Sequence, residues 1–353
     1  MKNLCELLQT EQPLIQAPMA GVQGWALAVA VSNTGALGSL PCAMLAPEAL
    51  QRELEALQAG TQRPVNLNFF CHTPPEPDAA HEAAWRRLLA PFYAEAGLDP
   101  ASVQVGAGRL PFSHAIADAI EPWHPPVLSF HFGLPAPDLL ARVKVWGAVV
   151  LASATTVAEA RWLQAHGADV VIAQGLEAGG HRGMFLTDDI TTQIGTLALL
   201  PQVVAAVKVP VIAAGGIADA AGVAAAMALG AAGVQVGSAY LCSDEATTSV
   251  LHRAALQSEA AQHTALTTLF SGRPARGIVN RVMRELGPLN PAAPAFPLAT
   301  AAIAPLRAHW EAKGSGDFTP LWAGQNASGC QALSAADITR RLAQGFGASL
   351  LTE

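Results

Sequence analysis

The segment ADVVIAQGLEAGGHRGMF, residues 168–185, decides the fold class of this chain. It begins with an apolar run rich in β-branched residues, which is the pattern of a strand buried on both faces. The polar Gln174 ends this run, and a glycine-rich loop that carries His181 follows it. A buried strand that delivers polar side chains to such a loop is typical of an active-site rim. The alternative is a glycine-rich surface loop with a solvated histidine.

Seven further apolar runs resemble this strand and alternate with helix-like segments. The eight runs cover 13–20, 35–40, 64–70, 126–133, 145–152, 168–175, 210–216 and 232–239, and the helical patterns include 47–58, 78–96, 156–166, 192–207 and 219–229. This alternation indicates parallel βαβ units, and eight strands are the number that closes a barrel. The sequence therefore predicts an α/β fold, a (β/α)8 TIM barrel. An open doubly wound sheet is the alternative.

Two regions depart from the alternation. Residues 71–125 are long and proline-rich and separate the third and fourth strand runs, and residues 246–353 follow the eighth run. We expect a barrel domain over residues 1–245 with a helical insertion at about 71–125. We expect residues 246–353 to form a mainly helical extension that packs on the barrel as a lid.

The composition excludes several classes of partner. The 353 residues are 51% hydrophobic and 13% charged, with a net charge of −7 and no basic block, which argues against nucleic acid or an anionic membrane. The N-terminus shows no signal-peptide pattern, and no apolar run has the length and continuity of a membrane span. The five scattered cysteines form neither a disulfide framework nor a metal-binding pair. We expect a cytoplasmic protein without a metal.

Glycine loops after the seventh and eighth strand runs point to a phosphate site. Gly215-Gly216 and Gly237-Ser238 follow these runs directly. TIM barrels often bind phosphate there through backbone N–H groups and a helix N-terminus. Neither a dinucleotide fingerprint nor a Walker lysine is present, so a mononucleotide such as FMN fits better. The alternative is that Gly215-Gly216 only makes a tight turn.

Three residues near the ends of other strand runs would suit a flavin ring. Met19 can pack against a flat ring system, and the amides of Asn68 and Gln174 offer donors and acceptors to its polar edge. Asn68 could equally cap a turn, and methionine is more often a core residue than a cofactor contact.

Two of the ten histidines are candidates for acid–base chemistry. His181 lies on the glycine loop, where it can meet a substrate, and we expect it to be the catalytic base. His131 lies between two phenylalanines in a buried run, so it is a candidate for the substrate pocket or a hydrogen-bonded structural histidine. Arg182 is expected to be structural or to attract an anion.

The ordered set of motifs resembles one known family. The set consists of QAPMAG (16–21), NLNFF (66–70), LSFHFGLP (128–135), QGLEAGGHRG (174–183), AAGGI (213–217), VQVGS (234–238) and SGRPARG (271–277). Together they resemble the nitronate monooxygenases, formerly called 2-nitropropane dioxygenases. Any single motif is weak, but the set spans residues 13 to about 283 in the family's order.

The resemblance implies a TIM barrel that holds FMN, contains no metal and does not use NAD(P)H. It implies that His181 is the catalytic histidine and that His131 belongs to the substrate-pocket motif. With the glycine loops, the predicted FMN contacts are Met19, Asn68, Gln174, Gly179, Gly180, Gly215, Gly216, Gln235, Val236, Gly237 and Ser238.

The implied reaction is the oxidation of an alkyl nitronate, such as propionate 3-nitronate, by O2. One electron passes to FMN, giving a semiquinone, and the products are a carbonyl compound and nitrite. For a neutral nitroalkane, His181 first removes the α-proton. The alternatives are an FMN-dependent NAD(P)H:quinone or enoyl-thioester reductase and a non-catalytic flavin-binding barrel.

The chain departs from the family pattern in one segment and leaves its assembly open. Relatives often place tyrosines in the helical segment after SGRPARG, whereas residues 285–310 contain none and offer Phe296, Arg307 and Trp310. The expected partners are a small nitronate or nitroalkane and O2, and the expected assembly is a monomer or homodimer.

Overall fold

A computed structural model describes residues 3–103 and 109–347 of the chain. Residues 1–2, 104–108 and 348–353 fall within the predicted barrel domain, insertion and extension respectively, and lie outside the described residues. None of the helices in the described part is long and apolar enough to cross a membrane.

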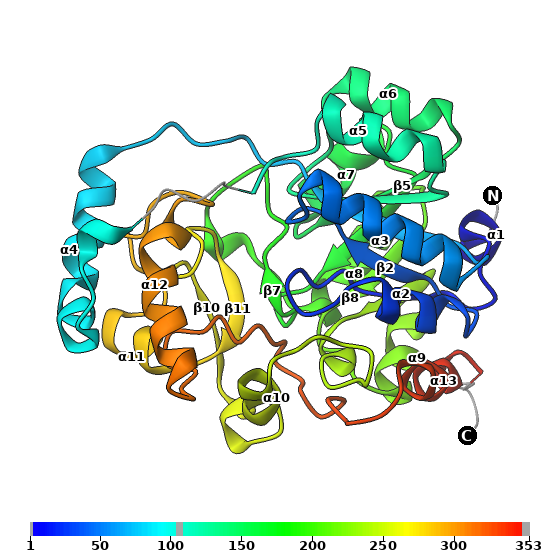
Figure 1. The fold of residues 1–353 in the computed structure, drawn as a ribbon. Helices are drawn as coiled ribbons and strands as arrows, with labels where there is room; N and C mark the ends of the chain where they lie inside the picture. Colours follow the sequence, from blue (N-terminus) through cyan, green and yellow to red (C-terminus); the bar gives the residue numbers. More distant parts are fainter. Residues whose placement is uncertain (1–2, 104–108, 348–353) are drawn as a thin grey trace.

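Eight parallel strands form a closed barrel (Figure 1). They are β1 (Leu14–Gln16), β2 (Gly38–Pro41), β3 (Val65–Phe70), β4 (Val127–His131), β5 (Val149–Ala154), β6 (Val170–Gln174), β8 (Val211–Ala214) and β9 (Gly233–Val236). Their order is β1-β9-β8-β6-β5-β4-β3-β2. A parallel bridge between Ile15 and Leu37 joins the two ends, with Gln16 N–H donating to Leu37 O at 2.9 Å. The TIM-barrel prediction is confirmed, and the open sheet is excluded.

Alternation along the strands separates an inner from an outer face. On β6, Val170 and Ile172 belong to the apolar cluster inside the barrel, whereas Val171 and Ala173 pack in the cluster between strands and helices. Because successive strand side chains point to opposite faces, Gln174 shares the inner face with Ile172. The same parity brings Asn68 of β3 and Gln235 of β9 to the inner face.

The barrel helices follow the predicted pattern. They are α2 (Trp25–Ser32), α3 (Pro47–Gly60), α6 (Pro137–Val145), α7 (Val157–Ala165), α8 (Thr196–Ala206), α9 (Ala220–Ala228) and α13 (Ala335–Ala343), and α1 (Leu4–Leu8) precedes β1. Thr156 and Asp219 cap α7 and α9 through side-chain oxygens. Helix α13 lies near the end of the chain, but it packs against α2 and α9 and completes the ring of helices around the barrel.

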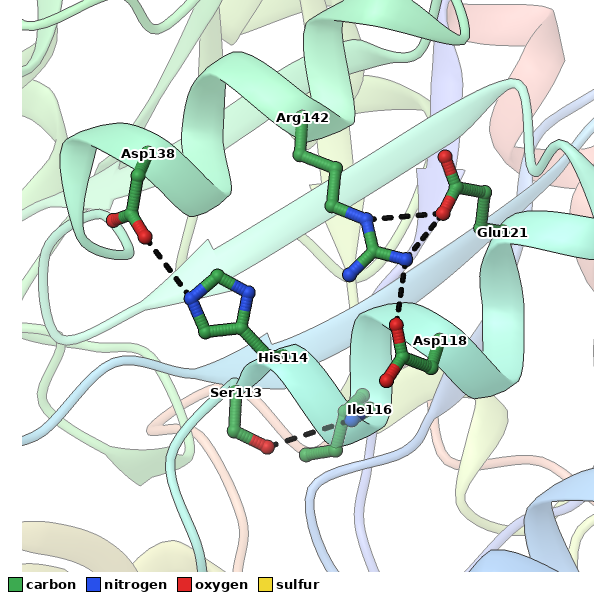
Figure 2. Close-up of polar contacts among 7 residues, drawn as sticks. All are labelled: Ser113, His114, Ile116, Asp118, Glu121, Asp138 and Arg142. Carbon is green, nitrogen blue, oxygen red and sulfur yellow. Dashed lines mark hydrogen bonds and ion pairs between the residues drawn. The ribbon is translucent and has the colours of Figure 1, made fainter.

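The proline-rich insertion is divided between two parts of the molecule. Its second helix, α5 (His114–Ile120), lies beside α6 (Figure 2). Arg142 of α6 binds Glu121 and, at 2.7 Å, Asp118, while His114 Nε2 lies 3.0 Å from Asp138 Oδ2. Exposed ion pairs of this kind contribute little stability, so we read this network as fixing the orientation of α5 on the barrel.

The first helix of the insertion, α4 (Ala79–Ala96), belongs to a second lobe. It packs against α12 (Ala299–Ala312), where the Trp85 indole donates to Ala299 O at 3.1 Å and the Tyr93 hydroxyl to Ala302 O at 2.6 Å. Figure 1 shows α4, α12 and α11 (Arg281–Leu286) together on the side away from the barrel helices. We call α4, α11, α12 and the small sheet described next the second lobe.

The second lobe contains an antiparallel sheet that reaches back to the barrel. It consists of β10 (Thr264–Thr267), β11 (Ala275–Ile278) and the two-residue β7 (Gly180–His181), in that order. The other elements are α10 (Val250–Leu256), α11 (Arg281–Leu286) and the 3-10 turns η1 (Pro100–Ser102), η2 (Glu121–Trp123), η3 (Ile190–Thr192), η4 (Ser238–Tyr240), η5 (Glu259–Gln262) and η6 (Gln344–Phe346). The extension thus contains strands as well as helices, and the predicted domain boundaries stay a prediction.

Candidate active site

A cavity lies at the carboxyl ends of the barrel strands, where the second lobe meets the barrel. Its empty volume, including the solvent at its mouth, is about 1430 Å³. Twelve of the thirteen predicted site residues line it: Met19, Asn68, His131, Gln174, Gly179, Gly180, His181, Gly215, Gly216, Gln235, Gly237 and Ser238. Residues from distant segments, among them Arg109 and Trp322, complete the wall. The structure therefore gathers nearly all of the predicted site at the face where TIM barrels carry out chemistry.

Val236 is the exception among the predicted site residues. Its side chain is 1% exposed and packs in the apolar cluster between strands and helices. The cause is strand parity, because its neighbour Gln235 occupies the inner face. The backbone oxygen of Val236 accepts a hydrogen bond from Ala17 N–H at 2.8 Å, so it joins β9 to the end of β1.

Three amides face the cavity from the barrel strands: Asn68, Gln174 and Gln235. Asn68 lies within β3 and does not cap a turn; its Nδ2 donates to Ser129 Oγ at 2.9 Å. The Oε1 atom of Gln235 is buried and has no hydrogen-bond partner among the described residues. An unpartnered buried acceptor at a cavity wall is suited to a ligand that supplies the donor.

Met19 lies at the cavity wall and in the apolar packing, and its contact with a flavin ring stays a prediction. It lines the cavity, and its side chain also packs against two apolar clusters. Its backbone N–H donates to Gln23 Oε1 at 3.0 Å, which fixes the turn after β1.

The two glycine loops form another part of the cavity wall. Gly215 and Gly216 have φ values of +117° and +74°, which favour glycine, so this is a tight turn that also lines the cavity. A segment returning from the second lobe holds both loops in place. Asn326 Nδ2 donates to Gly216 O at 3.1 Å, and Gly324 N–H donates to Ser238 Oγ at 2.9 Å. The sequence offered no signal for this return segment.

His181 is held by residues of the second lobe. Its strand β7 pairs with β11, and its Nε2 lies 2.8 Å from Ser271 Oγ. Ser271 Oγ donates to Arg273 O at 3.4 Å and can therefore accept from Nε2–H, which leaves Nδ1 as the basic nitrogen. Burial lowers the pKa of His181 well below its ordinary value, and the nearby positive charges, Arg109 first, lower it further. The ring is therefore neutral at pH 7 and can accept a proton.

His131 is tied directly to the His181 loop. Its Nε2 donates to the His181 carbonyl oxygen at 3.1 Å, and burial lowers its pKa to about 4. The ring also lines the cavity. His131 is thus a hydrogen-bonded histidine at the cavity wall, and its place in the substrate pocket stays a prediction.

Two arginines complete the cavity region and were not predicted. Arg109 comes from the insertion, and its guanidinium carbon lies 5.4 Å from the centre of the Phe296 ring. Arg273 donates to Met184 O at 2.6 Å, and its guanidinium carbon lies 4.2 Å from the centre of the Phe132 ring. Arg273 was detectable, because it belongs to the SGRPARG motif. Arg109 carries no sequence signal, since only the tertiary fold brings the insertion to the cavity.

Arg182 takes the structural role. Its side chain is fully buried and donates to Gly175 O at 2.7 Å, Gln174 O at 2.7 Å and Gln193 Oε1 at 2.9 Å. Burial lowers its pKa to about 10, so it stays charged at pH 7. These hydrogen bonds hold the end of β6 next to the loop that carries His181.

The donor set of the cavity suits a planar organic group with a phosphate. It offers amides, a hydroxyl and glycine backbone, and a Cβ built on Gly180 would meet nothing within 4 Å. Among residues 3–103 and 109–347, no three His, Cys, Asp or Glu side chains are placed to hold a metal ion. Fold and site together define a TIM-barrel enzyme with a cofactor-sized cavity at the carboxyl ends of its strands.

Comparison with known proteins identifies the family. The profile of the nitronate monooxygenase family matches residues 1–345, and the chain belongs to this family of flavin-dependent oxidoreductases. It is 42% identical to a nitronate monooxygenase of Pseudomonas aeruginosa, over 96% of this chain and 97% of the relative. It is 41% identical to one of Paraburkholderia phytofirmans, over 97% and 94% of the two chains.

Solved structures agree with this assignment. The structure of nitroalkane oxidase from Streptomyces ansochromogenes superposes with a TM-score of 0.87 at 38% identity, covering 96% of both chains. FabK from Thermotoga maritima superposes with a TM-score of 0.70 at 24% identity, covering 98% of this chain and 96% of FabK. The second likeness shows a shared fold alone.

Proposed function

We propose that this protein oxidises alkyl nitronates with O2 to a carbonyl compound and nitrite, using FMN and no NAD(P)H. The membership of the nitronate monooxygenase family and the likeness to nitroalkane oxidase support the reaction. The observation that carries the proposal is the neutral, half-buried His181 at a cavity lined by Arg109, where the charges of Arg109 and Arg273 both act on the imidazole. Such a site attracts an anionic nitronate and holds a base beside it.

The cavity residues divide naturally between the two ends of FMN. Gly215, Gly216, Gly237 and Ser238 would hold the phosphate, because their loops offer backbone N–H groups after the seventh and eighth barrel strands. Asn68 and Gln235 would bind the polar edge of the ring, where Gln235 Oε1 lacks a partner within the described chain. When bound, FMN supplies the ring that accepts an electron from the substrate.

His181 has a defined task only for neutral nitroalkanes. Its Nδ1 takes the α-proton, and the C–H electron pair moves toward the nitro group to give the nitronate. A preformed nitronate needs no base, because its α-proton is already gone. Phe132, Phe296 and Trp322 surround the imidazole at ring-centre distances of 6.2, 5.4 and 5.6 Å and shield it from water.

We also infer a cytoplasmic location and small-molecule partners. All five cysteines are free thiols in the structure, which agrees with a reducing compartment. The choice between monomer and homodimer stays a prediction.

The cofactor is tested with the purified protein. We expect a flavin absorbance spectrum and FMN as the flavin released by heat, and FAD or no flavin would contradict the proposal. Under anaerobic conditions, NADH and NADPH should leave the flavin absorbance unchanged over the turnover time. Rapid bleaching would instead favour an NAD(P)H-dependent reductase on the same fold.

A further inference from the structure

We propose that Arg109 is a specificity residue that binds a carboxylate at the end of the substrate remote from the nitronate. Arg109 would then account for part of the choice between carboxylate-bearing and simple alkyl nitronates. The inference deepens the proposed function and rests on it.

Arg109 reaches the cavity beside the proposed base. It lines the cavity, and its guanidinium carbon lies 5.4 Å from the centre of the Phe296 ring. The His181 ring lies 5.4 Å from the same centre. The guanidinium carbon and the imidazole thus lie at the same distance from one phenyl ring, and Arg109 is the charge that lowers the pKa of His181 most. A short substrate with its α-carbon at His181 can therefore extend toward Arg109.

No acidic side chain of the described residues forms an ion pair with Arg109. Its Nη1 atom is buried without a hydrogen-bond partner among residues 3–103 and 109–347. No carboxylate of these residues lies within 4.0 Å of its nitrogens. Burial and the like charge of Arg307 both lower its pKa. A half-buried guanidinium with one buried, unpartnered nitrogen and no acidic partner is stabilised when a ligand supplies a carboxylate, which it binds in a two-pronged geometry.

The FMN phosphate and the nitronate group of the substrate are also negatively charged, and residues other than Arg109 would bind them. The phosphate would lie at the glycine loops after β8 and β9, whereas Arg109 follows β3 in the chain. Arg273 stacks on Phe132, whose ring centre is 4.5 Å from that of His131, so it lies on the histidine side where the nitronate would bind. Arg109 therefore remains for a second anionic group on the substrate.

The test compares two nitronates of equal chain length. Propionate 3-nitronate carries a terminal carboxylate, and propyl-1-nitronate carries a methyl group in its place. For Arg109→Gln we expect kcat/KM to fall about tenfold or more with the first and less than about threefold with the second, as for loss of a charged hydrogen-bonded pair. Arg109→Lys should restore part of the preference, because it returns the charge without the two-pronged geometry.

Binding without turnover gives an independent readout. Succinate and butyrate match the two nitronates in shape, with one carboxylate in place of the nitronate group. Their dissociation constants can be measured from the change in the visible flavin spectrum of the holoenzyme. Arg109→Gln should weaken succinate about tenfold or more relative to butyrate. Arg284→Gln is the matched control, because Arg284 lies outside the cavity lining and donates to Val279 O at 3.3 Å.

The outcomes separate the inference from the proposed function. Equal effects of Arg109→Gln on both nitronates and both acids, or no effect on any of them, would overturn the role of Arg109. A wild-type enzyme that oxidises neither nitronate would overturn the proposed function. The ratio of succinate to butyrate binding would then still decide whether Arg109 recognises a carboxylate.

Discussion

The side chain of Gln174 clamps the loop that carries His181. Its Nε2 donates to the His181 carbonyl oxygen at 3.0 Å, and its Oε1 accepts from the Gly183 N–H at 2.8 Å. The carbonyl of His181 also accepts from His131 Nε2, so one backbone oxygen joins both histidines to β6. The loop is therefore held by the barrel on one side and by β11 on the other.

Gln174→Ala should loosen this loop. The variant loses two hydrogen bonds to backbone groups, and we expect the free energy of unfolding to fall by about 1–3 kcal/mol. Turnover of nitroethane should fall as well, because His181 loses its fixed position. Urea unfolding and initial rates measure the two effects. Gln202→Ala is the control, since Gln202 makes an exposed bond to Ala198 O; an equal loss in both variants would contradict the clamp.

His181→Asn should retain the flavin but impair the reaction of neutral nitroalkanes. A positioned general base contributes about 100-fold or more, and we expect at least about a tenfold loss of nitroethane turnover. Preformed ethyl nitronate serves as the internal control, because it needs no proton removal. Parallel oxygen-electrode rates with the two substrates provide the comparison. Unchanged nitroethane kinetics would remove His181 from the role of base.

Gly216→Val should expel FMN by crowding the phosphate loop. Gly216 has a φ of +74°, so any side chain also strains the backbone by about 1–2 kcal/mol. Gly147→Val is the matched control, because Gly147 has a φ of +86° and open space around it but lies outside the cavity lining. The ratio of flavin to protein absorbance after purification should fall in the first variant only. Full occupancy in Gly216→Val would place the phosphate elsewhere.

Acid should destabilise the protein partly through buried histidines. Burial lowers the pKa of His252 to about 4, although its Nε2 donates to Trp322 O at 3.0 Å. The unfolded chain binds the proton of His252 more readily than the folded chain does. The stability that the folded state owes to a neutral His252 is therefore complete above pH 6.5 and is lost as the pH falls toward 4.

His252→Gln should remove this contribution while it keeps a donor for Trp322. Relative to the variant, the wild type should lose up to about 1.4 kcal/mol of unfolding free energy per pH unit between pH 6.5 and 4. Urea unfolding at several pH values measures the difference. If the free energy of unfolding changes equally with pH in both proteins between pH 6.5 and 4, His252 does not contribute to the acid destabilisation.

The barrel could be predicted because its signals are local. Each strand is a short apolar run bounded by glycine or proline, and all eight predicted runs overlap observed strands. The site residues on these strands were equally accessible, since the carboxyl ends of parallel strands meet at one face. Val236 was wrongly placed among the residues that line the cavity, because the prediction took every residue of the VQVGS motif. In a strand, every second side chain points outward, and Val236 is one of these.

The second lobe could not be predicted because its contacts are not local. Strand β7 is two residues long and exists only through pairing with β11, which follows far along the chain. The packing of α4 on α12 joins the insertion to the extension, and α13 returns to complete the barrel. Arg109 reaches the cavity through these contacts, and Ser271 reaches His181. Ser271 belongs to the SGRPARG motif, but no spacing in the sequence indicates its contact with His181 or the position of Arg109.

The most direct test of the central claim is oxygen consumption with propionate 3-nitronate as the substrate and without NAD(P)H. The proposed function predicts that the purified flavoprotein consumes O2 and releases nitrite in proportion to the nitronate added. A flavin-loaded protein that releases no nitrite under these conditions would contradict it.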